Sequence, residues 1–281
     1  MATSPEILAT VADLRRWLAQ RRASGSRVGL VPTMGALHEG HLSLVRETKA
    51  RCGSTVVSIF VNPTQFGPNE DFARYPRTFE SDCAKLADLA DAVFAPSVAE
   101  MYPQGFASRI EVGGPALGLE ADFRPHFFSG VATVVAKLLI AVVPDEATFG
   151  EKDYQQLLVI RRLAADLGLP IEIRAGATMR EEDGLAMSSR NAYLSPGERE
   201  VAGRLNKILW MGAKSARDKV PLPQVETETV ARLLGAGFSL VDYVAIRDAD
   251  TLAAIEELER PARILVAAKV GGTRLIDNLP V

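Results

Sequence analysis

The feature that most constrains the fold is an alternation of short apolar runs with longer amphipathic segments. The apolar runs are residues 27–32, 55–61, 92–96 and 147–149, and residues 171–175 read as one more strand. Between them, apolar residues recur at three- and four-residue steps, which is typical of helices. Strands that are apolar on both faces indicate a parallel sheet with helices on each side. The sequence therefore predicts a Rossmann-like, doubly wound parallel sheet of the α/β class.

Two Ser-Pro pairs predict helix starts. Apolar residues recur with helical spacing over residues 7–18, and the pair at 4–5 supplies an N-cap and a first helical residue. The pair at 195–196 predicts in the same way the start of one long helix over residues 195–216.

The last third of the chain has a different pattern. Three segments read as antiparallel strands: residues 240–247, 263–269 and 274–279. A Gly-Gly pair at 271–272 predicts a turn before the last of them. We therefore expect a Rossmann-like domain over residues 1–184, followed by a smaller C-terminal α+β domain with a short antiparallel sheet over residues 185–281.

Composition and charge exclude several classes of protein. The 32 Lys and Arg against 35 Asp and Glu give a net charge of −3, without the basic excess of a nucleic-acid binder. The most apolar run, residues 131–143, is shorter than the roughly 20 residues that cross a bilayer, and the N-terminus lacks a secretory signal pattern. Two cysteines, Cys52 and Cys83, suit a reducing compartment. We expect a cytoplasmic protein that binds neither nucleic acid nor membrane.

Two of the three histidines lie in one segment that joins a predicted strand to a predicted helix. Residues 32–41 read Pro-Thr-Met-Gly-Ala-Leu-His-Glu-Gly-His. Nucleotides bind at such places because a helix N-terminus offers free N–H groups to phosphate. His38 and His41 could donate hydrogen bonds to charge that develops there. A zinc pair, which would need more ligands than the remaining His126, and two structural histidines are the alternatives.

This segment resembles the signature of the pantoate–β-alanine ligase family, within the H-x-G-H nucleotidyltransferase superfamily. Four more segments resemble the same family in the same order: FVNPTQF at 60–66, YPRT at 75–78, FGEKDYQQ at 149–156 and DGLAMSSRN at 183–191. The resemblance covers essentially the whole chain. It implies ATP-dependent condensation of (R)-pantoate with β-alanine through an enzyme-bound pantoyl-adenylate, giving pantothenate, AMP and pyrophosphate in coenzyme A biosynthesis. It also implies a homodimer.

The resemblance further implies which residues form the site. The implied catalytic residues are His38, His41, Lys152 and Arg190. The implied ATP-binding residues are Met34, Gly35, Ala36, Leu37, His38, Glu39, Gly40, His41, Gly150, Glu151, Lys152, Asp153, Met179, Met187, Ser188, Ser189 and Arg190. The implied substrate-binding residues are Asn62, Gln65, Arg124 and Gln156. Taken without the resemblance, these side chains also fit an Asx-turn, a surface lysine and a polar linker.

Magnesium is expected with ATP because it bridges phosphate oxygens and keeps several waters. Asp82 is the candidate protein ligand, although its place on a predicted helix also fits a solvated face. One segment departs from the family pattern Arg-Pro-x-His-Phe. Here Phe127 follows Arg124-Pro125-His126 and occupies the usual histidine position, which leaves the role of His126 open between surface and site.

Two other functions remain open at this point. A small-molecule nucleotidylyltransferase of the same superfamily would share the strand–loop–helix site, but it would not require Asn62, Gln65 and Gln156. A catalytically silent ATP-binding or scaffold protein would be expected to have lost the charges at the phosphate site, yet Lys152 and Arg190 are present. A tRNA synthetase is disfavoured by the short chain and by the absence of a basic anticodon-binding domain.

Overall fold

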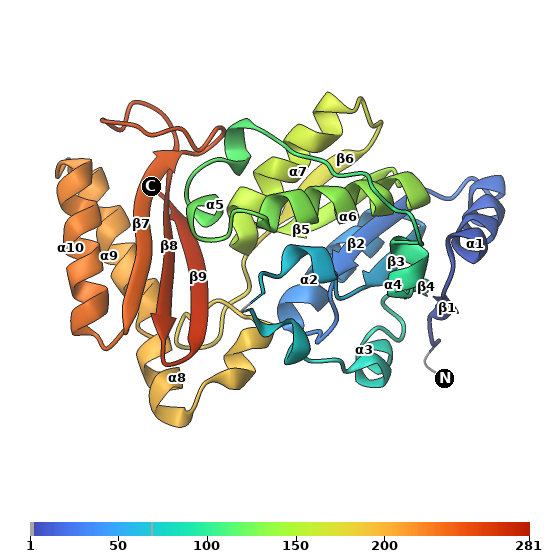
Figure 1. Ribbon diagram of the computed structural model, residues 1–281, viewed down its shortest axis with the longest axis horizontal. Helices are drawn as coiled ribbons and strands as arrows, with labels where there is room; N and C mark the ends of the chain where they lie inside the picture. The colour runs from blue at the N-terminus through green and yellow to red at the C-terminus, as the bar shows by residue number, and fades with distance from the viewer. Residues whose placement is uncertain (1–2, 69) are drawn as a thin grey trace. The chain divides into compact units, whose positions relative to one another are not determined.

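The computed structural model describes residues 3–68 and 70–281 (Figure 1). Contacts between residues divide the chain into two compact units. Unit 1 comprises residues 1–112, 124–151 and 159–177, and unit 2 comprises residues 113–123, 152–158 and 178–281. Each unit contains one sheet.

Unit 1 is built on a six-stranded parallel sheet. Its strands are β1 (Glu6–Leu8), β2 (Val28–Thr33), β3 (Ser54–Ile59), β4 (Ala92–Phe94), β5 (Glu146–Gly150) and β6 (Glu172–Gly176). The strand order is β1-β4-β3-β2-β5-β6, and every neighbouring pair is parallel. The chain therefore winds away from β2 in one direction and from β5 in the other. Ligands of such sheets bind where the winding reverses, at the carboxyl ends of these two strands.

Helices cover both faces of this sheet. They are α1 (Val11–Ala23), α2 (Glu39–Arg51), α3 (Phe79–Lys85), α4 (Val98–Met101) and α6 (Phe127–Val142), together with α7 (Tyr154–Asp166), which begins in unit 2 and continues in unit 1. Val31 of β2 packs with Leu44 and Val45 of α2. The alternate residues Val28 and Leu30 point to the other face and are equally buried. The predicted doubly wound sheet is confirmed, and no helix among the described residues is long and apolar enough to cross a membrane.

The predicted helix start at residues 4–5 is wrong. Residues 6–8 form β1, which pairs in parallel with β4, and the Glu6 N–H donates to the Asp91 carbonyl at 3.0 Å. Helix α1 begins at Val11 instead, after Thr10, whose hydroxyl accepts the Asp13 N–H at 3.1 Å. Pairing with a distant strand satisfies the backbone of residues 6–8, so it overrides the local helix signal.

The predicted helix over residues 195–216 is two helices, α8 (Pro196–Ala202) and α9 (Leu205–Arg217). The Ser195 N-cap is confirmed, and Glu198 completes a capping box by accepting the Ser195 N–H at 2.8 Å. Gly203 separates the helices at a place where an added Cβ would collide with the Asp183 carboxylate. The break therefore occurs where the chain passes close to the Asp183 carboxylate.

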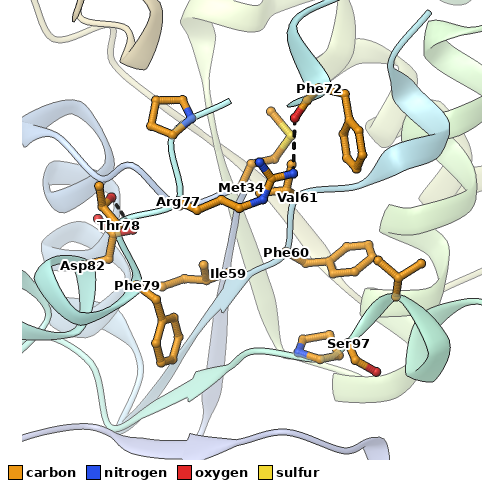
Figure 2. A pocket seen from close by; sticks show the side chains of 14 residues that line it. Met34, Ile59, Phe60, Val61, Phe72, Arg77, Thr78, Phe79, Asp82 and Ser97 are labelled. Atoms are coloured by element: carbon orange, nitrogen blue, oxygen red, sulfur yellow. Dashed lines mark hydrogen bonds between the residues drawn. The ribbon is translucent and has the colours of Figure 1, made fainter. Parts of the chain in front are cut away.

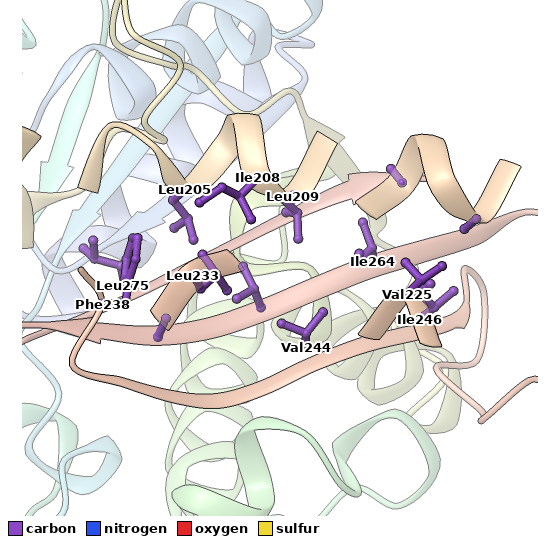
Figure 3. Close-up of a cluster of buried hydrophobic side chains, with 14 of the residues drawn as sticks. Leu205, Ile208, Leu209, Val225, Leu233, Phe238, Val244, Ile246, Ile264 and Leu275 are labelled. Carbon is purple, nitrogen blue, oxygen red and sulfur yellow. The ribbon is translucent and has the colours of Figure 1, made fainter. Parts of the chain in front are cut away.

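Unit 2 is an α+β structure, as predicted. Its antiparallel sheet has the order β7 (Leu240–Asp248), β8 (Ala262–Val270) and β9 (Thr273–Pro280), and its further helices are α5 (Glu120–Phe123) and α10 (Leu222–Gly235). Side chains of α9 and α10 pack on one face of this sheet around Leu209, Leu233 and Ile264 (Figure 3). The turn between β8 and β9 uses Gly271 at φ +54°.

The division of the chain differs from the single boundary that we placed between residues 184 and 185. Segments 113–123 and 152–158 group with the C-terminal unit. Gln155 explains part of this grouping, because its amide donates to the carbonyls of Pro115 at 3.0 Å and Gly118 at 3.1 Å. These hydrogen bonds join segments far apart in sequence, and no local pattern predicts them.

Candidate active site

The loop between β2 and α2 has an unusual backbone. Residues 34–38, here called the motif loop, contain two consecutive left-handed residues, Gly35 at φ +82° and Ala36 at φ +51°. Glycine adopts this conformation freely, whereas the Cβ of an alanine comes too close to the following carbonyl oxygen, which costs free energy. The two residues turn the chain sharply, so that His38 becomes the N-cap of α2.

The structure brings the two predicted catalytic histidines together. The ring centroids of His38 and His41 are 4.0 Å apart, with the planes tilted by 41°. The Nδ1 atom of His41 accepts the backbone N–H of His38 at 3.4 Å, so a neutral His41 ring carries its proton on Nε2. Two imidazoles thus stand at the N-terminus of α2, beside the carboxyl end of β2, where the helix dipole favours an anion.

Asp82 on α3 lies beneath the motif loop. It is completely buried, so the solvated face that we considered for it is wrong. Its carboxylate accepts the N–H groups of Ala36 at 2.9 Å and Leu37 at 2.8 Å. The ammonium of Lys85 donates to the Leu37 carbonyl at 2.7 Å. The role of Asp82 as a magnesium ligand stays a prediction, and no group of three or more metal-binding side chains occurs in the part of the chain that the structure describes.

Asn62 and Gln65 lie just beyond β3, around the short 3-10 helix η1 (Pro63–Gln65). Asn62 is buried and forms the Asx-turn that was its alternative reading, with the Thr64 N–H donating to its Oδ1 at 3.3 Å. Its amide also donates to Gln65 Oε1 at 3.1 Å. The Gln65 amide in turn lies 3.0 Å from the sulfur of Met34. The structure therefore places Gln65 beside the motif loop.

Two residues that support Asn62 were not predicted. The Tyr102 hydroxyl donates to Asn62 Oδ1 at 2.7 Å, and burial raises the pKa of Tyr102. Gly130 of α6 accepts from the Asn62 amide at 3.2 Å through its carbonyl. A Cβ on Gly130 would collide with the Thr64 carbonyl, so only glycine lets α6 approach η1 this closely. The only signal in the sequence is a glycine inside an apolar helix pattern.

Arg124 makes its contacts within unit 1. Its guanidinium donates to both carboxylate oxygens of Glu70, at 2.7 and 2.6 Å, and to the Gln65 carbonyl at 3.2 Å. It also stacks on Phe127, with 3.8 Å from the guanidinium carbon to the ring centroid. The Phe127 ring thus serves as a platform for Arg124. His126 is exposed at the N-cap of α6 and makes no side-chain cap.

A pocket of about 330 Å³ lies in unit 1 beside the motif loop (Figure 2). Met34, Gly35 and Asp82 line one part of it, and most of its remaining lining is apolar, including Phe60. Arg77 also lines the pocket, and its guanidinium donates to the Phe72 carbonyl at 3.2 Å, as Figure 2 shows.

The predicted phosphate-binding residues of unit 2 begin with Lys152, in the 3-10 helix η4 (Glu151–Asp153) that leads into α7. Its ammonium lies 3.9 Å from the Asp153 carboxylate, and its carbonyl accepts from the Asn278 amide at 2.9 Å. Gln156 is half-buried one residue after the fully buried Gln155.

The second predicted phosphate segment of unit 2 is a capped 3-10 helix, η5 (Ser189–Tyr193). Ser188 is its N-cap and accepts the Arg190 N–H at 3.3 Å. The Met187 N–H donates to the Met179 carbonyl at 2.9 Å, so these two residues lie side by side. Met179 is 37% exposed, which leaves part of its thioether surface open to a ligand.

The site residues proposed from sequence are divided between the units. Those in unit 1 are residues 34–41, Asn62, Gln65, Asp82, Arg124, Gly150 and Glu151. Those in unit 2 are Lys152, Asp153, Gln156, Met179 and residues 187–190. Most of them lie at strand ends or in capped loops, whereas Asp82 lies on α3 and Gln156 on α7.

Comparison with known proteins gives a consistent result. The family profile described as pantoate-beta-alanine ligase matches residues 6–280. The pantothenate synthetase of Paramagnetospirillum magneticum is 53% identical, and the match covers 100% of this chain and 99% of that protein. The pantothenate synthetase of Mesorhizobium japonicum is also 53% identical, with 99% and 98% covered.

Solved structures agree with the relatives. Pantothenate synthetase from Thermus thermophilus superposes with a TM-score of 0.90 at 47% identity, covering 98% of each chain. Pantoate–β-alanine ligase from Francisella tularensis, in a complex titled with beta-gamma ATP and β-alanine, gives 0.81 at 34% identity, covering 98% of this chain and 97% of that one.

Proposed function

This chain belongs to the pantoate–β-alanine ligase family and joins pantoate to β-alanine; we propose that it does so through an enzyme-bound pantoyl-adenylate. In the first step the carboxylate of (R)-pantoate attacks the α-phosphorus of ATP, and pyrophosphate leaves. In the second step the neutral amine of β-alanine attacks the carbonyl carbon of this mixed anhydride, and AMP leaves. The products are pantothenate, AMP and pyrophosphate.

The observation that carries the proposal is the pair of imidazoles at the N-terminus of α2. The first step brings two anions together, so it requires donors aimed at the phosphate oxygens where charge develops. His38 and His41, with ring centroids 4.0 Å apart, provide two such donors at the positive end of a helix dipole. A catalytically silent homologue would be expected to lack the charged residues of the phosphate site, but this chain has Lys152 and Arg190.

The proposed contacts to pantoate are amides. Gln65 lies beside Met34 of the motif loop, and Asn62 holds the Gln65 side-chain oxygen. An amide offers both a donor and an acceptor, which suits a substrate that carries a hydroxyl and a carboxylate. Gln156 is proposed to contact pantoate as well, and these amides favour a ligase over a nucleotidylyltransferase that stops at nucleotide transfer. Arg124 supports the same region by anchoring the Gln65 carbonyl.

The proposed nucleotide contacts in unit 2 are cationic and hydroxylic. Lys152 and Arg190 supply positive charge for the phosphates, and Ser188 and Ser189 supply hydroxyl donors. The half-open Met179 fits an adenine face. Mg²⁺ enters the proposed reaction with ATP, as part of the substrate, where it bridges phosphate oxygens.

The experiment that tests the proposal is exchange of labelled pyrophosphate into ATP with Mg²⁺ and no β-alanine. We expect exchange only when pantoate is present, because only then does the adenylate form reversibly. Exchange without pantoate would mean that another group accepts the adenylyl moiety, which would contradict the proposed first step, and absence of both exchange and pantothenate formation in a protein that binds ATP would indicate the nucleotidylyltransferase alternative. Pantothenate and AMP formation with β-alanine, but no exchange without it, would mean that all three substrates must bind before chemistry and would contradict an adenylate formed before β-alanine binds.

The proposal also includes the assembly and location of the enzyme. On the family resemblance we expect a cytoplasmic homodimer. Light scattering over a range of protein concentrations checks the homodimer, and fractionation of the source cells checks the cytoplasmic location. A monomer at every concentration would contradict the dimer.

A further inference from the structure

We infer that Asp82 and Lys85, here called the α3 clasp, hold the motif loop in the conformation that places the two histidines. In this inference Asp82 is a positioning residue and not a magnesium ligand. The inference rests on the proposed adenylation for its kinetic test, but its structural test is independent of any reaction.

The motif loop requires an external support because its conformation is unfavourable. Gly35 and Ala36 are both left-handed, and this conformation costs an alanine free energy that other contacts must offset. Such a turn also points successive N–H groups in nearly the same direction. The Gly35 N–H donates to the Thr33 hydroxyl at 3.2 Å, and the next two N–H groups need acceptors of their own.

Asp82 meets this need with one carboxylate. Its Oδ2 accepts the Ala36 N–H at 2.9 Å, and its Oδ1 accepts the Leu37 N–H at 2.8 Å. The Thr78 hydroxyl donates to Oδ2 at 3.2 Å, as Figure 2 shows. Hydrogen bonds to an ionised acceptor are stronger than neutral ones, and complete burial removes competition from water.

Lys85 holds the other side of the same backbone. Its ammonium donates to the Leu37 carbonyl at 2.7 Å, while Asp82 accepts from the Leu37 N–H. The two clasp residues are three positions apart on α3, so they lie on one face of the helix. The Leu37 side chain is 2% exposed and packs with Val45 and Leu86. Its side chain is therefore held as well as its N–H and its carbonyl.

The clasp acts on the histidines through the chain. His38 follows Leu37 directly, and the His38 N–H contacts His41 Nδ1. A shift of the Leu37 peptide therefore displaces both imidazoles from the phosphate position. Both Asp82 oxygens already accept backbone N–H groups inside the protein, so the geometry assigns this carboxylate to the loop.

The test compares Asp82→Asn with the wild-type enzyme. Asparagine keeps the shape of aspartate but can accept through only one atom and places an NH₂ group against one loop N–H. We expect pantoate-dependent pyrophosphate exchange to fall by about 10²-fold, the effect of a misplacement near 1 Å. The Mg²⁺ concentration that gives half-maximal exchange should not change.

Hydrogen exchange gives a readout that does not depend on activity. The amides of Ala36 and Leu37 should exchange slowly in the wild-type protein and rapidly in Asp82→Asn, while core amides of β2 keep their protection. Lys85→Met retains the apolar stem and removes only the donor, so its effect on pyrophosphate exchange should be smaller, roughly tenfold at most. Glu80→Gln, which changes an exposed carboxylate on the same helix, is the matched control and should behave like the wild type.

Three outcomes would overturn the inference. One is wild-type pyrophosphate exchange in Asp82→Asn. Another is a tenfold or larger rise in the Mg²⁺ requirement with Ala36 and Leu37 still protected, which would make Asp82 a metal ligand. The third is rapid hydrogen exchange of these two amides in the wild-type protein. This measurement, together with the kinetics of Lys85→Met, tests the inference even where Asp82→Asn fails to fold. Absence of pyrophosphate exchange in the wild type would instead contradict the adenylate, and the amide measurement would still test the clasp.

Discussion

The parallel sheet of unit 1 and the antiparallel sheet of unit 2 bury their charged groups in different places. In unit 1 one buried carboxylate begins a strand and another lies beneath a loop that follows one. Glu146 begins β5 and is paired with Arg51 at 3.0 Å, and Asp82 lies beneath the loop that follows β2. In unit 2 a buried charged cluster lies on a face of the sheet. Arg274 of β9 is paired with Glu120 at 2.8 Å and with Asp242 at 2.6 Å.

The difference follows from what covers each sheet. Helices bury both faces of the parallel sheet, so β2 and β3 have no face left for charge, and polar groups concentrate at the edges where the loops begin. In the antiparallel sheet Val244 and Leu275 pack in the apolar cluster under α9 and α10. Their neighbours Tyr243 and Arg274 point to the opposite face, where a polar network is possible. Thus unit 1 holds its proposed catalytic histidines at one end of the sheet, whereas unit 2 uses buried charge to anchor the segment around Glu120.

The largest expected effect is a loss of stability when the charged cluster around Arg274 is broken. Arg274→Met leaves the Glu120 and Asp242 carboxylates without their main partner, and removal of one member of a buried ion pair costs about 3–5 kcal/mol. Urea unfolding measures the loss. Arg232→Met, which breaks a partly exposed pair with Glu228, is the control and should cost about 0.5 kcal/mol or less. Equal losses in both variants would mean that the network is no more than a surface pair.

The next effect is on the edge of the parallel sheet. His41→Ala removes one preorganised donor, so pantoate-dependent pyrophosphate exchange should fall by about 10²–10³-fold in a protein that stays folded. The exchange rate and the urea midpoint are the two measurements. His126→Ala provides the control, because this third histidine is exposed and should be neutral. Normal exchange in a folded His41→Ala protein would remove His41 from the site.

Gln65→Ala should act on binding more than on chemistry. Loss of a hydrogen bond to a charged substrate is worth about 1.5–3 kcal/mol, so the KM for pantoate should rise by roughly 10- to 100-fold. Steady-state kinetics with pantoate varied at saturating ATP measures the change. Gln224→Ala, at an exposed position on α10, is the control. Unchanged KM and kcat for pantoate would place Gln65 outside the pocket.

The smallest effect is a pH-dependent one in unit 2. The Arg199 guanidinium beside Asp183 holds the pKa of that carboxyl below its ordinary value of 3.8. A carboxyl with a lowered pKa adds stability at neutral pH, which is lost as the pH falls below that value. Because the side chains of Asp183 and Arg199 are 42% and 33% exposed, Asp183→Asn should cost less than about 1 kcal/mol at pH 7. Urea unfolding should show that the difference in stability between the wild type and Asp183→Asn is smaller at pH 3 than at pH 7. An equal difference at both pH values would contradict this cause.

Several features were predictable from the sequence because they depend on neighbouring residues. Apolar runs indicated strands buried on both faces, and β2 to β5 lie where these runs are, whereas β6 lies where residues 171–175 read as a strand but is largely half-buried. The Ser195 cap and the turn at Gly271 follow from short-range hydrogen bonds and from a left-handed backbone angle. His38 and His41 lie within one helical turn, so their proximity also follows from local geometry.

Other features were decided only by tertiary structure. Residues 6–8 carry a helical pattern, but parallel pairing with β4 makes them a strand. Gln155 ties down residues 115–118, and Asp82 binds Ala36 across 46 positions of sequence. Each of these depends on a buried polar group finding a distant partner. Burial makes an unsatisfied group costly, so the folded chain selects such pairs, whereas local sequence carries no record of which residues will meet.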